Sequence, residues 1–125
     1  GDAVETPGLV FTESDAVIPD VIWASKERIE NGVDEAGHFT VAPELVVEVL
    51  SAGSKNEQRD REVKLRIYSL YGVQEYWIAN WRLKTLEVYR RQNAHLKIVE
   101  TLTVGDQLTS PILPDFECAI SDILL

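Results

Sequence analysis

Two carboxylates stand inside apolar stretches of the sequence, where a charged group needs a partner. Asp20 lies in VIPDVIW (17–23), and Glu48 lies in LVVEVL (45–50). Burying a carboxylate costs several kcal/mol unless it is paired or holds a metal ion. Acids brought together from neighbouring strands are the oxygen ligands that Mg²⁺ or Mn²⁺ takes in proteins. The alternative for each acid is an ordinary strand-end residue that faces solvent.

Lys64 is a third residue whose type and spacing suit chemistry. It lies four residues after Asp60 and four before Tyr68 in a stretch with helical periodicity, so the three share one helix face. An ammonium group beside acids can stabilise the negative charge that develops in a reaction. The same spacing also fits a plain surface ion pair between Asp60 and Lys64, worth about 0.2–0.5 kcal/mol.

Length and composition fit one ordinary globular domain. The chain has 125 residues, of which 45% are hydrophobic and 26% are charged, and single domains most often have about 100–150 residues. The apolar stretches fall far short of the roughly 20 residues that a membrane span needs. The first residues lack the basic and apolar regions of a signal peptide. We therefore expect no membrane association and a cytoplasmic location. Because Cys118 is the only cysteine, the chain cannot form an intramolecular disulfide.

The net charge of −9 is unevenly distributed along the chain. Residues 1–48 carry −9, residues 49–99 carry +5, and residues 100–125 carry −5. An acidic protein is a poor general binder of nucleic acid, because phosphate affinity rises with the number of Lys and Arg contacts. The basic middle segment is either a local nucleic-acid footprint or a solvated helix face of mixed charge.

The elements that must position these residues follow from periodicity. Strands are predicted at 9–13, 16–24, 45–51, 74–80, 83–91 and 94–102, and a helix at 56–71 that ends at Gly72. Residues 1–8 are predicted to be an irregular lead-in, residues 25–40 a short helical turn and a loop, and the C-terminal segment a proline-rich stretch with a short apolar turn. The order predicts a single α/β (α+β) domain over 9–125 with a mixed sheet.

Five motifs occur in order and at tight spacing: PDV (19–21), PELVVEVLS (43–51), RDxxxK (59–64), Tyr68 and GVxEYW (72–77). Together they resemble the Uma-two family of restriction-endonuclease-like proteins, within the PD-(D/E)XK nuclease superfamily. The resemblance covers roughly residues 9–125. It implies a restriction-endonuclease-like mixed sheet with a crossover helix, and hydrolysis of phosphodiester bonds with Mg²⁺ or Mn²⁺ as the cofactor.

The resemblance also implies roles for individual residues. Asp20 and Glu48 correspond to the metal-binding acids, and the carbonyl of Val49 is a candidate additional ligand. The catalytic lysine of the superfamily usually lies two residues after the second acid, where this chain has Leu50. In this family that role falls on Lys64 of the following helix. Asp60 and Tyr68 match motif positions without an assigned role, and Glu75 is expected to be structural.

Several expectations stay open at the level of sequence. Family members carry a helix and strands before the PD motif, so relative to them the N-terminal part is shortened. The alternatives to a nuclease are an inactive nuclease-fold binding module and an oligomeric structural module that lacks a complete site; a homodimer is one such assembly. The substrate implied is a nucleic acid, with DNA as the first expectation. Four helix-region cations would flank a phosphate track if they lie beside the acids: Lys55, Arg59, Arg61 and Arg66.

Overall fold

The computed structural model describes residues 2–5, 9–10, 16–17, 21–32, 40, 42–50, 57–80 and 82–124. Its centre is a six-stranded sheet of order β1-β4-β5-β6-β7-β8, in which β5 and β6 are parallel and the other neighbours are antiparallel. The strands are β1 (Asp2–Glu5), β4 (Val21–Ala24), β5 (Leu45–Leu50), β6 (Glu75–Asn80), β7 (Thr85–Gln92) and β8 (His95–Leu102). The α+β class and the mixed sheet predicted from the sequence are confirmed.

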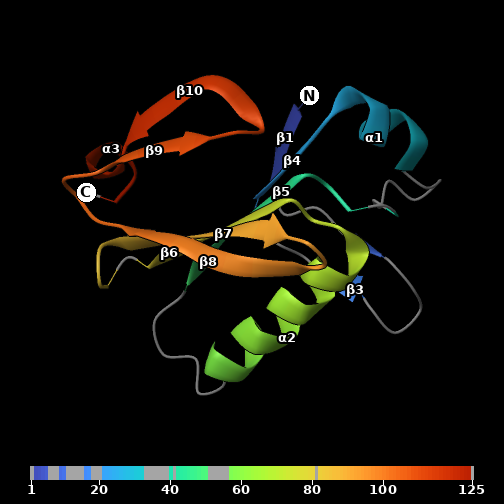
Figure 1. Ribbon diagram of the computed structural model, residues 1–125, viewed down its shortest axis with the longest axis horizontal. Helices are drawn as coiled ribbons and strands as arrows, with labels where there is room; N and C mark the ends of the chain where they lie inside the picture. The colour runs from blue at the N-terminus through green and yellow to red at the C-terminus, as the bar shows by residue number, and fades with distance from the viewer. Residues whose placement is uncertain are drawn as a thin grey trace.

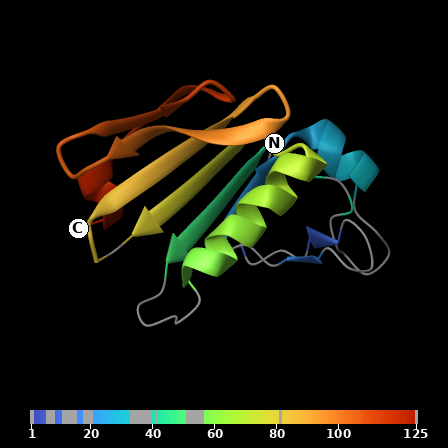
Figure 2. The same cartoon turned by 60° about the horizontal axis from the view of Figure 1, so that its bottom comes forward.

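The helix α2 (Glu57–Tyr71) connects the two parallel strands and lies across one face of the sheet (Figures 1 and 2). Parallel neighbours need such a crossover, because a tight turn can join only antiparallel strands. The helix ends where the sequence predicts: Gly72 has a positive φ of 96° and the N–H of Val73 donates to the carbonyl of Tyr68 at 3.1 Å. This is the Schellman arrangement that a C-terminal glycine favours.

Alternation along β5 and β6 sends side chains to two separate cores. The core beneath α2 contains Ile22, Ala24, Val46, Tyr68, Val73, Tyr76, Ile78 and Leu96. The core on the opposite face contains Leu45, Trp77, Ala79, Leu86, Val88, Leu102, Leu108 and Ile120. Strand β5 is therefore covered on both faces, as its nearly continuous apolar run predicts.

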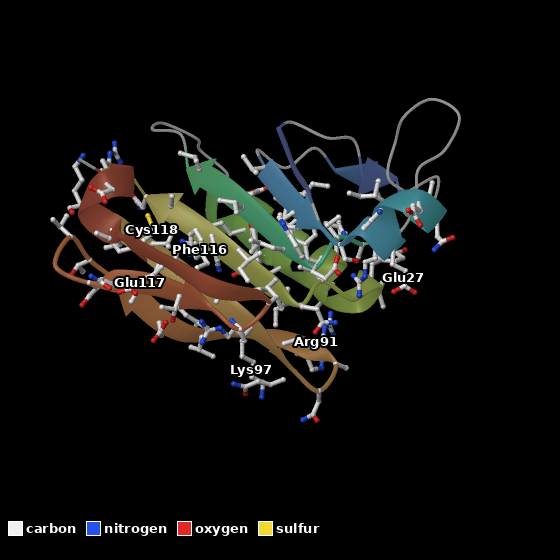
Figure 3. All side chains as sticks on the ribbon, turned by 90° about the horizontal axis from the view of Figure 1, so that it is seen from above. Glu27, Arg91, Lys97, Phe116, Glu117 and Cys118 are labelled. Carbon is white, nitrogen blue, oxygen red and sulfur yellow. The ribbon has the colours of Figure 1, made fainter. Side chains whose placement is uncertain are left out.

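The opposite face is covered by the C-terminal part of the chain. Strands β9 (Gln107–Ser110) and β10 (Leu113–Ala119) form a hairpin, followed by α3 (Ile120–Leu124). Phe116, labelled in Figure 3, stacks on Trp77 with ring centroids 6.2 Å apart. The sequence predicts only a short apolar turn for the end of the chain, so this hairpin is a correction. Prolines and a register shift between Leu113 and Glu117 hide its alternation.

The N-terminal region also departs from the prediction. The irregular lead-in is wrong for Asp2–Glu5, which form β1 by pairing with β4. A four-residue edge strand is too short to leave a periodic signal of its own. The segment 16–24 contains two strands, β3 (Ala16–Val17) and β4, and β3 pairs with β2 (Leu9–Val10) in a separate hairpin.

The remaining elements follow the sequence closely. The short helical turn is α1 (Lys26–Gly32), and β7 and β8 form the predicted hairpin, with Asn93 at a positive φ of 61° in its turn. No helix in the described part of the chain is long and apolar enough to cross a membrane.

Candidate active site

Glu48 is a buried acid in the core beneath α2, with 6% of the residue exposed. Its Oε2 accepts hydrogen bonds from Lys64 Nζ at 3.1 Å and from the Tyr76 hydroxyl at 3.2 Å. Its Oε1 accepts one from the Tyr68 hydroxyl at 3.3 Å. Hydrogen bonds from three donors, one of them cationic, offset the desolvation cost of burying this carboxylate. The alternative that Glu48 faces solvent at a strand end is therefore wrong.

Two of these donors come from one side of α2. Lys64 and Tyr68 are four residues apart, so both side chains descend from the same helix face onto β5. Tyr68 is fully buried, whereas the Lys64 side chain is 33% exposed. Lys64 thus links the buried carboxylate to the solvent side of the cluster.

The third donor, Tyr76, was not singled out by the sequence. It lies on β6, where the parallel register pairs Val46 with Tyr76 and Glu48 with Ile78. Burial raises the pKa of the Tyr76 hydroxyl far above its usual range, and the charge of Glu48 raises it further. The hydroxyl therefore keeps its proton and remains a donor to Glu48. The alternation of EYWI separates Tyr76 from Glu75 and Trp77, but the register that brings it to Glu48 is a tertiary feature.

A second polar group lies further along the same face of the sheet. Glu87 on β7 pairs with Ile78, which in turn pairs with Glu48, so the two acids lie in one row separated by one strand. Arg61 of α2 binds both carboxylate oxygens of Glu87, and the Tyr89 hydroxyl donates to Glu87 at 3.4 Å. Burial and the charge of Glu87 raise the pKa of Tyr89. The charge of Glu87 is thereby balanced within the protein.

The structure brings together some of the predicted residues and not others. Asp20, Lys55 and the side chains of Arg59 and Asp60 lie outside the described residues. Lys64 and Tyr68 contact Glu48, as described above. Val49, the candidate carbonyl ligand, follows Glu48 on β5.

The predicted phosphate track along α2 is not supported by the two arginines that are described. Arg61 is held by Glu87. Arg66 is exposed and lies two residues from Lys64, which places it about 200° around the helix at 3.6 residues per turn. Arg66 therefore points away from Glu48, and the track is wrong at this position.

Glu75 has the structural role expected from the sequence. It is almost fully buried and accepts hydrogen bonds from Ser110 Oγ at 2.6 Å, Trp77 Nε1 at 2.8 Å and Arg90 Nε at 3.4 Å. These partners belong to β6, β7 and β9. Glu75 therefore ties the C-terminal hairpin to the sheet, on the face opposite Glu48.

The donor chemistry at Glu48 fits a hard divalent cation in kind. Mg²⁺ prefers carboxylate oxygens and is often held by one or two carboxylates together with water and substrate phosphate. A carboxylate offers about four lone-pair positions, and three donors approach Glu48 in this structure. Within the described residues, no group of three or more His, Cys, Asp and Glu could hold a metal ion.

Comparison with a solved structure supports the fold. The chain matches the "Crystal structure of a putative nuclease belonging to DUF820 from Anabaena variabilis ATCC 29413" with a TM-score of 0.69 and 21% sequence identity. The match covers 98% of this chain and 66% of that protein's chain, so this chain spans less than two thirds of its neighbour. Comparison with curated proteins gave no match.

Comparison with protein-family models identifies the family. The model described as "Uma2: Putative restriction endonuclease" matches residues 3–121, which is nearly the whole chain. The match includes every motif on which the resemblance in the sequence depends, from PDV to GVxEYW. The chain therefore belongs to the Uma2 family.

Proposed function

We propose that the protein is a metal-dependent endonuclease that hydrolyses phosphodiester bonds of nucleic acid, with DNA as its substrate. The observation that carries the proposal is the cluster at Glu48. A buried carboxylate with Lys64 at 3.1 Å and two phenol donors has the residue types that phosphoryl chemistry uses. Membership of the family described as "Putative restriction endonuclease" supports the same reaction class.

The residues proposed to hold Mg²⁺ or Mn²⁺ are Asp20 and Glu48, with the carbonyl of Val49 as an additional ligand. The register of β4 against β5 supports this choice, because Val21 pairs with Val47. The last described pair between β4 and β5 is therefore one residue away in sequence from each acid: Val21 is next to Asp20, and Val47 is next to Glu48. When bound, the cation would polarise the phosphoryl group and lower the pKa of a bound water.

The protein's own side chains have distinct tasks in this proposal. Tyr68 and Tyr76 orient the Glu48 carboxylate from two different elements, so its position is set before substrate binds. Lys64 donates to Glu48 and carries further N–H donors toward solvent, where they stabilise negative charge on the phosphate. The proposal thus gives Lys64 the role of the catalytic lysine that the family resemblance implies.

The location of the cluster also suits a substrate site. Glu48 lies in the second half of β5, beside the parallel strand β6. Ligands of open α/β sheets bind outside the carboxyl ends of the strands. Figure 2 shows the ends of β5 and β6 and the start of α2 on the same side of the molecule.

The test is a Mg²⁺ and Mn²⁺ titration with a parallel nuclease assay on wild type, Glu48→Gln and Glu100→Gln. Glu48→Gln keeps the shape of the side chain, and Glu100 is an exposed acid on β8 that serves as the matched control. We expect metal-dependent cleavage in wild type and Glu100→Gln, and its loss in Glu48→Gln. Equal cleavage by all three proteins would refute the role of Glu48.

A nucleic-acid binding assay beside the cleavage assay separates the nuclease from the inactive binding module. Nucleic-acid binding without cleavage in wild type, at any Mg²⁺ or Mn²⁺ concentration, would favour the binding module. A homodimer stays a prediction that the solution mass decides, because a dimer has twice the 14.1 kDa of the chain. A cytoplasmic location likewise stays a prediction.

A further inference from the structure

The turn between β6 and β7 presents an exposed leucine between two cations. Its described residues are Arg82, Leu83 and Lys84, and Leu83 is 68% exposed. We define this segment as the β6–β7 turn. Single exposed leucines are common on protein surfaces. The observation that matters here is the position of Leu83 between two cations in a turn near the proposed active site.

The β6–β7 turn has a defined conformation. The side-chain oxygen of Asn80 accepts hydrogen bonds from the N–H groups of Arg82 at 3.0 Å and of Leu83 at 3.1 Å. Lys84 has a positive φ of 54°, which closes the turn into β7. An Asn side chain that binds the backbone two and three residues later fixes a turn locally. Leu83 is therefore held at the tip in a fixed place.

The β6–β7 turn lies beside the proposed active site. Asn80 pairs with Leu50, two residues beyond the pair formed by Glu48 and Ile78. With a rise of about 3.3 Å per residue and about 4.8 Å between strands, the backbone of Asn80 is roughly 8 Å from that of Glu48. Figures 1 and 2 both show the turn on the side of the sheet where β5 ends.

We infer that the β6–β7 turn contacts the nucleic acid next to the bond that is cut, an inference that rests on the proposed function. Arg82 binds a backbone phosphate, with Lys84 adding positive charge, and Leu83 packs against sugar and base edges. A nucleic acid advances about 3.4 Å per nucleotide, so the turn reaches about three nucleotides from the scissile phosphate. Proteins that bind the DNA minor groove combine Arg and Lys contacts with apolar side chains that insert between base steps. The occupant we assign is duplex DNA.

Charge complementarity supports this assignment over a protein partner. The chain as a whole has a charge of −9, yet the turn carries two cations and no acid. A positive tip on an acidic protein attracts a polyanion locally while the rest of the surface repels it.

The test measures the affinity for a fluorescent 20-base-pair duplex by anisotropy, with Ca²⁺ replacing Mg²⁺, over a range of salt concentrations. Arg82→Gln should weaken binding roughly tenfold at about 0.1 M salt and lower the slope of log K against log salt by about 1. The matched control is Lys97→Gln, an exposed cation on β8 at the other end of the sheet, labelled in Figure 3. The control should change neither quantity.

The apolar contact is tested with a second matched pair. Leu83→Ser should weaken binding at all salt concentrations and leave the salt slope unchanged. Leu70→Ser is its control, because Leu70 is 71% exposed and lies near the far end of α2. Tighter binding of the single strand than of the duplex by wild type would overturn the choice of duplex DNA.

The outcomes distinguish this inference from the proposed function. If wild type binds and cleaves DNA but Arg82→Gln behaves like Lys97→Gln, the turn is not a DNA contact and the nuclease proposal stands. If wild type binds DNA through the turn but never cleaves it, the turn is a DNA contact, and its position next to a cut bond fails together with the nuclease proposal. If wild type neither binds nor cleaves, both are wrong.

Discussion

Replacing Tyr76 with Phe removes one hydroxyl from the core and leaves the ring in place. The hydroxyl donates to a buried carboxylate at 3.2 Å, and hydrogen bonds to charged groups contribute about 1.5–3 kcal/mol. Lys64 and Tyr68 continue to donate to Glu48 in the variant, so we expect the lower part of this range, about 1.5–2 kcal/mol at neutral pH. In urea this corresponds to a midpoint roughly 1 M lower with an unchanged m value.

The pH dependence of this loss has a definite sign. In the folded protein, burial and then the charge of Glu48 raise the pKa of Tyr76 far above the ordinary value of 10.0. Stability from the protonated hydroxyl is fully present below pH 10 and falls as pH rises above it, because the unfolded chain releases the proton while the folded protein retains it. For one tyrosine the unfolded state gains about 1 kcal/mol between pH 10 and pH 11. The Tyr76→Phe variant has no such proton to lose.

The assay is urea unfolding of wild type and Tyr76→Phe at several pH values between about 8 and 11. The difference between their free energies of unfolding should shrink by about 1 kcal/mol over the last pH unit. Val88→Ala is the control: it opens a cavity at a fully buried position in the opposite core and changes no titrating group. If the difference in free energy of unfolding between wild type and Tyr76→Phe is as constant with pH as the difference for Val88→Ala, Tyr76 does not keep its proton in the folded protein and the reasoning is refuted.

Three further changes test other parts of the structure. Lys64→Met should lower the free energy of unfolding by about 1–2 kcal/mol, a value discounted for the partial exposure of Lys64. The loss should be clearly smaller in a Glu48→Gln background, and a double-mutant cycle in urea measures the difference. Gly72→Ala should lower the free energy of unfolding by about 1–2 kcal/mol, measured by thermal unfolding. The loss comes from backbone strain at a φ of 96° and not from a clash, because no atom lies within 4 Å of the added Cβ. Gly72→Asn should lower the free energy of unfolding by less. Arg91→Met should accelerate amide exchange in the last turn of α2 at least tenfold and leave β5 unchanged, because Arg91 binds the carbonyls of Tyr68 and Ser69.

The sequence predicts most of the sheet that carries the site, because those elements have strong local signals. The apolar run of β5, the periodicity of α2 and the alternation of the β7–β8 hairpin each extend over six or more residues, which is long enough to recognise in the sequence. Gly72 marks the end of α2 because only a residue without Cβ readily adopts its φ. The β9–β10 hairpin lacks such a signal, since packing on Trp77 and the bond from Ser110 to Glu75 hold it in place.

Only some residues of the site can be predicted from the sequence. Glu48 and Lys64 can be proposed from residue type, apolar context and motif spacing. Tyr76 could not, because its contact with Glu48 depends on the parallel register of β5 and β6, and registers between distant strands leave no local trace. The pairing of Arg61 with Glu87 was missed for the same reason, and it removes Arg61 from the predicted phosphate track.

The cluster at Glu48 is hard to explain by stability alone. Replacing a buried ion pair with apolar side chains of similar volume is often neutral or stabilises by about 1–4 kcal/mol. We therefore expect the combined variant Glu48→Leu, Lys64→Met, Tyr68→Phe and Tyr76→Phe to unfold in urea at or above the wild-type midpoint, with no nuclease activity. That result would mean that the fold does not need these four polar side chains and that their chemistry accounts for them. A combined variant less stable than wild type by more than about 3 kcal/mol would instead assign the cluster to the architecture of the core.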